Sequence, residues 1–331
     1  MTRHDRLSSV NGLAAALQSG DRRALARAVT LVESTKADDR KHSENLLMAL
    51  LPRTGGAMRI GISGAPGVGK STFIEAFGLH LTAQRKKVAV FAIDPSSRRG
   101  GGSILGDKTR MERLSRQPNA YIRPSPAGMT LGGVARRTRE CLLLAEAAAF
   151  DVVVVETVGV GQSETAVADM SDLFVLLAGP GGGDDLQGIK RGVMELADLV
   201  LVTKSDGDLK PASRRAVADY HAALHLMRPK HEGLSPKVLA VSALEGVGVD
   251  AAWSEMETIH HALAADGRLA RLRADQARIW FRSEVQAVLN ESILADAGLS
   301  ARAHALEEAV AEGTALPYAA ARDLLSRPSP A

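Results

Sequence analysis

The stretch Gly64-Ala65-Pro66-Gly67-Val68-Gly69-Lys70-Ser71 is a complete G-x-x-x-x-G-K-S phosphate loop. An apolar run, residues 58–63, precedes it and a helical pattern begins at Thr72, which is the strand–loop–helix context that the motif requires. Glycines let backbone N–H groups turn inward around phosphate oxygens, and the following helix points its positive end at the same oxygens. We therefore expect this segment to bind nucleotide phosphates, with Lys70 reaching the β- and γ-phosphates and the Ser71 hydroxyl binding Mg²⁺.

Composition excludes several classes of protein. The chain has 331 residues, of which 45% are hydrophobic and 3% aromatic, and its formal net charge is +3. The densest basic cluster, residues 136–139, is interpreted as a solvated helix face, so we expect no nucleic-acid partner. The sequence has no signal-peptide core and no apolar run of transmembrane length, which predicts a cytoplasmic protein without membrane association. The single cysteine, Cys141, lies in an apolar helical pattern and is expected to be a packed thiol.

Hydrophobic patterning divides the chain into three parts. Residues 1–56 form a helical N-terminal extension, residues 57–265 alternate strands with helices, and residues 266–331 are helical again. The expected strands are 58–63, 87–93, 152–155, 173–177, 199–202 and 237–241. Because continuous apolar strands separated by helices are typical of parallel sheets, we predict an α/β fold with a mostly parallel central sheet. The ligand is expected at the carboxyl ends of the strands.

Two later segments predict recognition of guanine. Thr203-Lys204-Ser205-Asp206 ends a buried strand with T-K-x-D, where GTPases usually carry N-K-x-D. Asp206 is expected to accept hydrogen bonds from two guanine nitrogens that adenine does not offer as donors, while the Lys204 stem packs along the base. The Thr203 hydroxyl replaces only part of the usual amide's hydrogen bonding, which leaves the tightness of selectivity open. Ser242-Ala243-Leu244, after the last strand, resembles the loop whose backbone N–H meets guanine O6.

Acidic residues near the ends of neighbouring strands predict the metal site. Asp94 and Glu156 end two strands, and Asp107 follows the first of them. Together with Ser71 they are expected to hold Mg²⁺, partly through water. Glu156 occupies the place of the usual aspartate of a D-x-x-G loop, and the backbone N–H of Gly159 is expected to approach the γ-phosphate.

The segment after Gly159 predicts slow hydrolysis. Val160 stands where Ras-like GTPases carry the glutamine that orients the attacking water, and Gln162 lies nearby without having to point at the nucleophile. We expect a partner or a second subunit to accelerate turnover, and the candidate catalytic groups are Lys70, Glu156, Gly159 and Gln162. The glycine-rich residues 179–190 are a candidate switch loop, and a passive strand–helix connection is the alternative.

These segments resemble the MeaB/ArgK family of G proteins, which are chaperones of cobalamin-dependent acyl-CoA mutases. The resemblance covers nearly the whole chain, and its most specific segments are 64–71, 94–97, 106–111 and 156–164. Ala65 fits as well, because MinD-like relatives carry an extra signature lysine at that position. The resemblance implies a SIMIBI-type P-loop GTPase domain that binds GTP or GDP with Mg²⁺, flanked by helical N-terminal and C-terminal extensions.

The same resemblance implies a partner and an assembly. It implies binding to methylmalonyl-CoA mutase, gating of adenosylcobalamin loading, and protection of the mutase from inactivation, with residues 179–190 communicating the nucleotide state. It also implies a homodimer built largely from the C-terminal helices. An apolar stripe through Phe281, Val285, Val288 and Leu289 supports that dimer, and packing back onto the nucleotide domain is the alternative.

Two other functions remain open at this point. A nickel or zinc metallochaperone GTPase would use cysteine and histidine clusters, but Cys141 stands alone and His260-His261 is interpreted as a helix surface pair. A small-molecule phosphotransferase would need an acceptor pocket and a base, and the sequence identifies neither. The fold alone does not decide between these functions.

Overall fold

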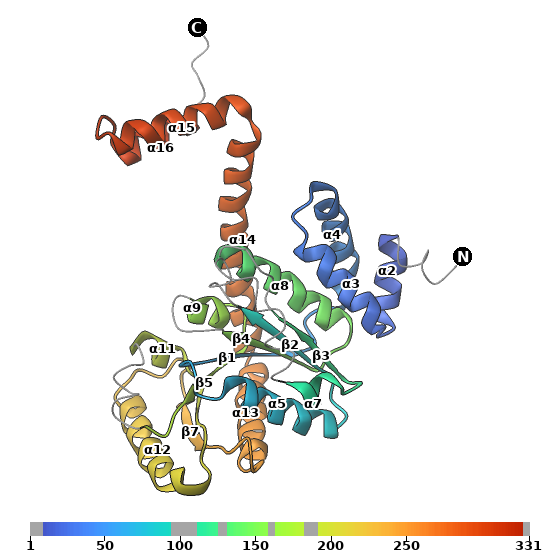
Figure 1. Cartoon of the computed structure of the whole chain (residues 1–331), viewed down its shortest axis with the longest axis vertical. Helices are drawn as coiled ribbons and strands as arrows, with labels where there is room; N and C mark the ends of the chain where they lie inside the picture. The colour runs from blue at the N-terminus through green and yellow to red at the C-terminus, as the bar shows by residue number, and fades with distance from the viewer. Residues whose placement is uncertain (1–8, 94–110, 125–130, 158–162, 182–190, 327–331) are drawn as a thin grey trace. The chain divides into compact units, whose positions relative to one another are not determined.

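The computed structural model describes residues 9–93, 111–124, 131–157, 163–181 and 191–326 (Figure 1). The chain separates into two compact units, Met1–Arg273 and Ala274–Ala331. This division falls later in the chain than the expected boundary at 265/266. Among the described residues, no helix combines the length and apolar character needed to cross a lipid bilayer.

The first unit is built on a seven-stranded sheet in the order β3-β2-β4-β1-β5-β6-β7. Every pairing in this sheet is parallel, which confirms the predicted α/β fold. The strands are β1 (Met58–Gly64), β2 (Val88–Ile93), β3 (Ala120–Arg123), β4 (Val152–Thr157), β5 (Leu173–Ala178), β6 (Leu199–Val202) and β7 (Lys237–Ala240). Because the central strands are buried on both faces, their side chains read as continuous apolar runs rather than as an alternating pattern.

Strand β3 was not predicted. Its four residues extend the sheet beyond β2, beginning with the pairing of Val88 with Ala120. The segment Ala-Tyr-Ile-Arg has only two residues that favour strands, and it is too short to show a periodic pattern.

Two hydrophobic clusters cover the two faces of the sheet. Phe73, Phe77 and Trp253 belong to one cluster. Its helices are α5 (Lys70–Ala83), α7 (Glu112–Ser115) and α13 (Val249–Ala265). The other cluster includes Cys141, which is buried as expected. Its helices are α2 (Val10–Gln18), α3 (Arg22–Glu33), α4 (Ala37–Leu50), α8 (Leu131–Ala147), α9 (Ser163–Ala168), α11 (Arg191–Leu196) and α12 (Lys210–His225).

The N-terminal helices join the sheet domain through α8. Asp21 caps α3 by accepting hydrogen bonds from the backbone N–H groups of Arg23 and Ala24. Arg137 of α8 is buried, and its guanidinium donates to the Ser34 carbonyl at 3.2 Å and to Glu140 at 3.0 Å. The prediction of a solvated face at residues 136–139 is therefore wrong for Arg137, because α3 and α4 pack over it.

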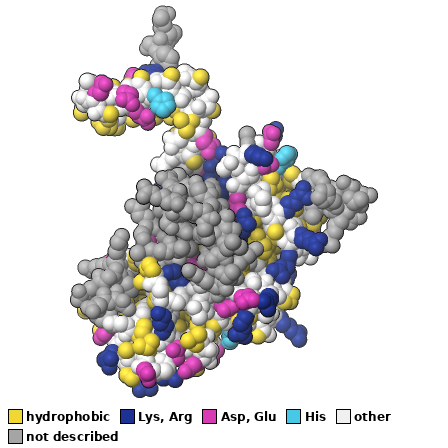
Figure 2. All heavy atoms as spheres, viewed as in Figure 1, with side chains coloured by type: hydrophobic (Ala, Val, Ile, Leu, Met, Phe, Trp, Pro, Cys, Tyr) yellow, Lys and Arg dark blue, Asp and Glu magenta, His cyan; other side chains and the backbone are white. Residues whose placement is uncertain are grey.

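The second unit is helical. It comprises the remainder of α14 (Arg268–Ala295) together with α15 (Ala297–Ala311) and α16 (Pro317–Leu325). Hydrophobic side chains are visible at its surface in Figure 2. The predicted apolar stripe lies on α14, where Phe281 is 68% exposed and Leu289 is 50% exposed.

Candidate nucleotide site

The phosphate loop connects β1 to α5 and closely approaches β5. A Cβ atom added at Gly64 would lie 2.5 Å from the carbonyl oxygen of Leu177, so a larger residue would force the two backbones apart. Gly67 and Gly69 have positive φ angles of 76° and 100°, which favour glycine. Apart from the adjacent residues of the chain, no atom of the described residues lies within 4 Å of a Cβ built at either position, so the backbone is uncovered there. This geometry suits phosphate oxygens bound by backbone N–H groups.

Lys70 lies inside the loop. Its ammonium group donates to the carbonyl oxygens of Gly64 at 2.7 Å and Ala65 at 3.2 Å. Burial lowers the pKa of Lys70, while the nearby carboxylates of Glu156 and Glu164 raise it. The effect of burial is the larger, so the pKa of Lys70 is lowered overall, and the two carboxylates oppose this by favouring the charged form of the lysine.

Ser71 and Glu156 bring oxygen ligands together beside Lys70. Strand β4 pairs with β1 so that Glu156 lies opposite Ile62, and the Ser71 hydroxyl donates to the Glu156 carboxylate at 3.3 Å. The Thr157 hydroxyl donates to the Ser63 hydroxyl at 2.8 Å and ties the same two strand ends together. Hydroxyl and carboxylate oxygens are ligands that suit Mg²⁺, so these two residues fit the predicted metal.

Several predicted site residues lie outside the described residues. These are Asp94, Asp107, Gly159, Gln162 and most of the glycine-rich segment 179–190.

The two segments predicted to recognise guanine lie side by side. The Ser242 hydroxyl donates to the Asp206 carboxylate at 2.6 Å, and the Ser205 N–H donates to the Val241 carbonyl at 3.1 Å. The same Ser242 oxygen accepts from the Glu245 N–H at 3.0 Å. Lys204 adopts a positive φ of 54°, a conformation that costs energy for a residue with a side chain. The Ser242 hydroxyl thus orients the Asp206 carboxylate, and the other two bonds hold the two segments against each other.

Thr203 makes a contact that its sequence position does not predict. Its buried hydroxyl lies 2.6 Å from the carbonyl oxygen of Val68, in the phosphate loop, and 3.1 Å from that of Ala178, at the end of β5. A hydroxyl has one hydrogen to donate, and the shorter distance favours Val68. Thr203 therefore connects the base segment to the phosphate loop.

Replacement of Thr203 by valine tests this connection. Valine has a similar shape but no donor, so the Val68 carbonyl loses its partner, and we expect GTP to bind about tenfold more weakly. Calorimetric titration with a non-hydrolysable GTP analogue measures the effect. Thr203→Ser is the matched control, because it keeps the hydroxyl and should keep most of the affinity. Equal affinity of the valine variant and the unmodified protein would contradict the role.

The parallel sheet, the phosphate loop after β1 and the T-K-x-D segment after β6 define a P-loop nucleotide-binding protein of the GTPase class. The chain belongs to the MeaB family of GTPases: the family model described as methylmalonyl Co-A mutase-associated GTPase MeaB matches residues 25–297.

Similar proteins agree with this assignment. A Caulobacter vibrioides protein whose name describes a GTPase is 53% identical, and the match covers 96% of both chains. The mouse methylmalonic aciduria type A homolog, mitochondrial, is 48% identical over 96% of this chain and 78% of its own. The crystal structure of a LAO/AO transport system kinase matches with a TM-score of 0.77, 39% identity and 96% coverage of both chains.

Proposed function

We propose that this GTPase is a chaperone of adenosylcobalamin-dependent methylmalonyl-CoA mutase, which gates cofactor loading and protects the mutase from inactivation. The family match carries the proposal, because its description names a GTPase associated with that mutase and it spans residues 25–297. The similarity to a mouse protein named for methylmalonic aciduria supports it.

The proposal assigns a role to each part of the nucleotide site. GTP or GDP is bound by Gly64, Ala65, Pro66, Gly67, Val68, Gly69, Lys70, Ser71, Thr72, Thr203, Lys204, Asp206, Ser242, Ala243 and Leu244. The metal ligands are Ser71, Asp94, Asp107 and Glu156. When bound there, Mg²⁺ neutralises charge that develops on the phosphates.

Lys70 would supply the protein's own positive charge to the transferred phosphoryl group, since its ammonium already lies within the loop. Glu156, Gly159 and Gln162 complete the proposed catalytic group. Because Val160 cannot orient a water molecule, intrinsic hydrolysis is slow and the mutase stimulates it.

We also propose that residues 266–331 form a homodimerisation region. Phe281, Val285 and Leu289 are exposed at 68%, 40% and 50% on one helix. Exposed apolar side chains gathered in this way mark protein–protein contacts, and a second copy of the chain is the occupant that the family resemblance implies.

GTP turnover with and without purified mutase tests the chaperone function at fixed Mg²⁺. We expect a slow basal rate that rises at least about tenfold with the mutase, since a group supplied in trans can raise such rates by about 10³- to 10⁵-fold. The Lys70→Ala variant, mixed with the same mutase preparation, measures any contaminating GTPase. A rate indifferent to the mutase, together with direct metal binding by the isolated protein, would favour a metallochaperone instead.

A further inference from the structure

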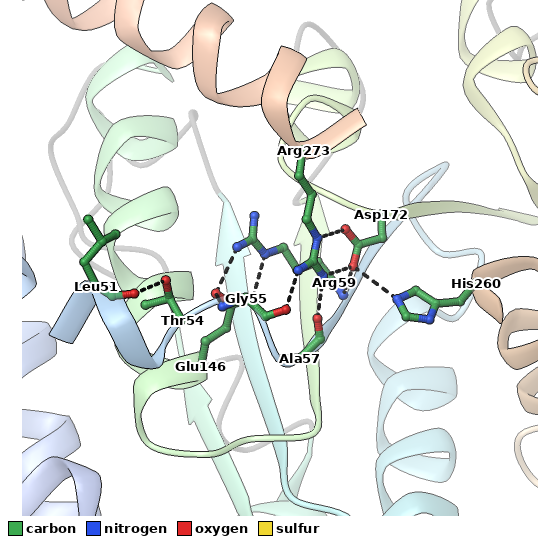
Figure 3. Close-up of polar contacts among 9 residues, drawn as sticks. All are labelled: Leu51, Thr54, Gly55, Ala57, Arg59, Glu146, Asp172, His260 and Arg273. Carbon is green, nitrogen blue, oxygen red and sulfur yellow. Dashed lines mark hydrogen bonds and ion pairs between the residues drawn. The ribbon is translucent and has the colours of Figure 1, made fainter. Parts of the chain in front are cut away.

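A buried polar network lies at the amino ends of β1 and β5, at the opposite end of these strands from the phosphate loop (Figure 3). Asp172, which is fully buried, immediately precedes β5. Its carboxylate accepts two hydrogen bonds from the Arg273 guanidinium, at 2.8 Å from Nε and 2.7 Å from Nη2. It also accepts from the Arg59 backbone N–H at 2.8 Å. The Arg273–Asp172 pair is therefore a bidentate salt bridge, the strongest geometry available to arginine and a carboxylate.

Arg273 also binds the chain that leads into β1. Its Nη1 donates to the Gly55 carbonyl at 2.6 Å, and its Nη2 donates to the Ala57 carbonyl at 2.7 Å. A second ion pair stabilises the same segment before β1. The Arg59 guanidinium donates to the Glu146 carboxylate at 2.8 and 2.9 Å, and this carboxylate also accepts from the Gly55 N–H. Arg273 therefore fastens the first turns of α14 to the sheet.

His260 of α13 stands beside this pair without joining it. Its Nε2 atom lies 3.8 Å from the nearer Asp172 oxygen, beyond hydrogen-bonding distance. That nitrogen is buried and has no hydrogen-bond partner among the described residues. The charged or titratable groups that influence it are Asp172, Arg273 and its neighbour His261. The prediction that both histidines lie on a helix surface therefore holds for His261, which is exposed, but not for His260, which is half-buried.

We propose that Asp172 is a two-position latch: its carboxylate holds Arg273 in the state described here and takes His260 when Arg273 withdraws. A fully buried carboxylate left without a cation would be strongly destabilising. A movement of about 1 Å brings the His260 nitrogen from its present position into hydrogen-bonding distance. His260 then takes one proton from solvent and becomes the imidazolium that replaces the guanidinium, so the buried charge stays balanced.

The latch connects the nucleotide site and helix α14 through covalently continuous segments of the chain. Asp172 leads into β5, whose last residues lie against Gly64 and Thr203 in the nucleotide site. Arg273 lies on α14, which continues into the second unit. When His260 replaces Arg273 as the partner of Asp172, the first turns of α14 lose their attachment to the sheet. The Asp172 carboxylate just before β5 still keeps a cationic partner.

The latch predicts a particular dependence of protein stability on pH, set by protonation of His260. In the unmodified protein, burial lowers the pKa of His260, Arg273 and His261 add to the lowering, and Asp172 opposes it. A His pKa below its unfolded value removes stability as the pH falls below about 6.5. Without Arg273, the Asp172 carboxylate should raise the His260 pKa above that of the unfolded chain. Stability is then gained at low pH and lost as the pH rises, which is the reverse dependence.

Arg273→Gln in the full chain tests the exchange. Thermal unfolding should show a lower Tm than the unmodified protein at pH 8, and this deficit should shrink at pH 5.5, where His260 is charged. NMR titration should show the His260 pKa rising by about one unit or more, a tenfold change in proton affinity. The control compares Arg273→Gln combined with His260→Gln against His260→Gln alone, because both proteins lack the titrating imidazole. The deficit between these two proteins should stay the same at both pH values.

A deficit that is equal at pH 8 and pH 5.5 in the single variant would overturn the latch. Should Arg273→Gln fail to fold, Asp172→Asn in an unchanged background provides a second test. Loss of that carboxylate should lower the His260 pKa further, and an unchanged pKa would show that the two groups do not interact. His260→Gln alone should leave the Tm at pH 8 unchanged, because His260 donates no bond to Asp172 in the described state.

Discussion

Substitution of Lys70 by alanine is expected to lower kcat for GTP hydrolysis by about 10³-fold with the fold retained. The Lys70 ammonium lies inside the phosphate loop, 2.7 Å from the Gly64 carbonyl oxygen, and faces the carboxylates of Glu156 and Glu164. Alanine removes the protein's positive charge from the place where phosphoryl charge develops. Phosphate release under saturating GTP measures the loss, and circular dichroism with thermal unfolding reports whether the fold is intact.

Lys41→Ala is the matched control for this experiment. Lys41 is exposed on α4, which belongs to the hydrophobic cluster on the face of the sheet opposite α5, so its substitution removes the same charge at a position away from the phosphate loop. We expect its kcat to equal that of the unmodified protein. Near-normal turnover by Lys70→Ala would refute the assignment of the phosphate loop.

Substitution of Asp206 by asparagine is expected to reduce the preference for GTP over ATP by at least about 100-fold. Each hydrogen bond from guanine to a charged carboxylate contributes about 1.5–3 kcal/mol, and two are lost or weakened. The Ser242 hydroxyl, 2.6 Å from Asp206, holds the side chain in place and limits its ability to find other partners. Competition of GTP and ATP against a fluorescent guanine nucleotide measures the ratio of dissociation constants.

Asp208→Asn provides the control for base recognition. Asp208 is exposed in the short helix η3 (Gly207–Leu209), only two residues beyond Asp206. Asp208→Asn makes the same carboxylate-to-amide change two residues away from Asp206. It should leave the preference for GTP over ATP unchanged. If Asp206→Asn kept its selectivity for GTP, the carboxylate would not be the group that distinguishes the bases.

Local patterns predicted the sheet and the order of the nucleotide segments. Buried parallel strands give long apolar runs, and the phosphate loop requires a particular sequence between a strand and a helix, so both features are visible locally. The hydrogen bond between Ser242 and Asp206 was not predicted, although both residues follow neighbouring parallel strands, whose carboxyl ends lie at the same edge of the sheet. Strand β3 escaped prediction because four residues with two strand formers give no detectable period.

Long-range side-chain pairs could not be predicted in the same way. Thr203 and Val68 are separated by 135 positions, and Arg273 and Asp172 by 101. The local sequence around a threonine or an arginine does not indicate which distant carbonyl or carboxylate its side chain will contact in the folded protein. Arg137 shows the same limit, because a basic residue on a helix is usually solvated and only tertiary packing buries this one.

Cys141 gives the molecule a practical property. It is the single cysteine of the chain, it is fully enclosed in the core, and burial raises its pKa well above the usual value for a thiol. Alkylating and disulfide-forming reagents attack the thiolate, so the native protein offers them no ready target. A cysteine introduced at an exposed position outside the proposed dimer region, for instance in place of Leu226, which is 86% exposed, would be the only reactive thiol. Spectroscopic labels and cross-linkers can then be directed to one chosen position without first removing a native cysteine.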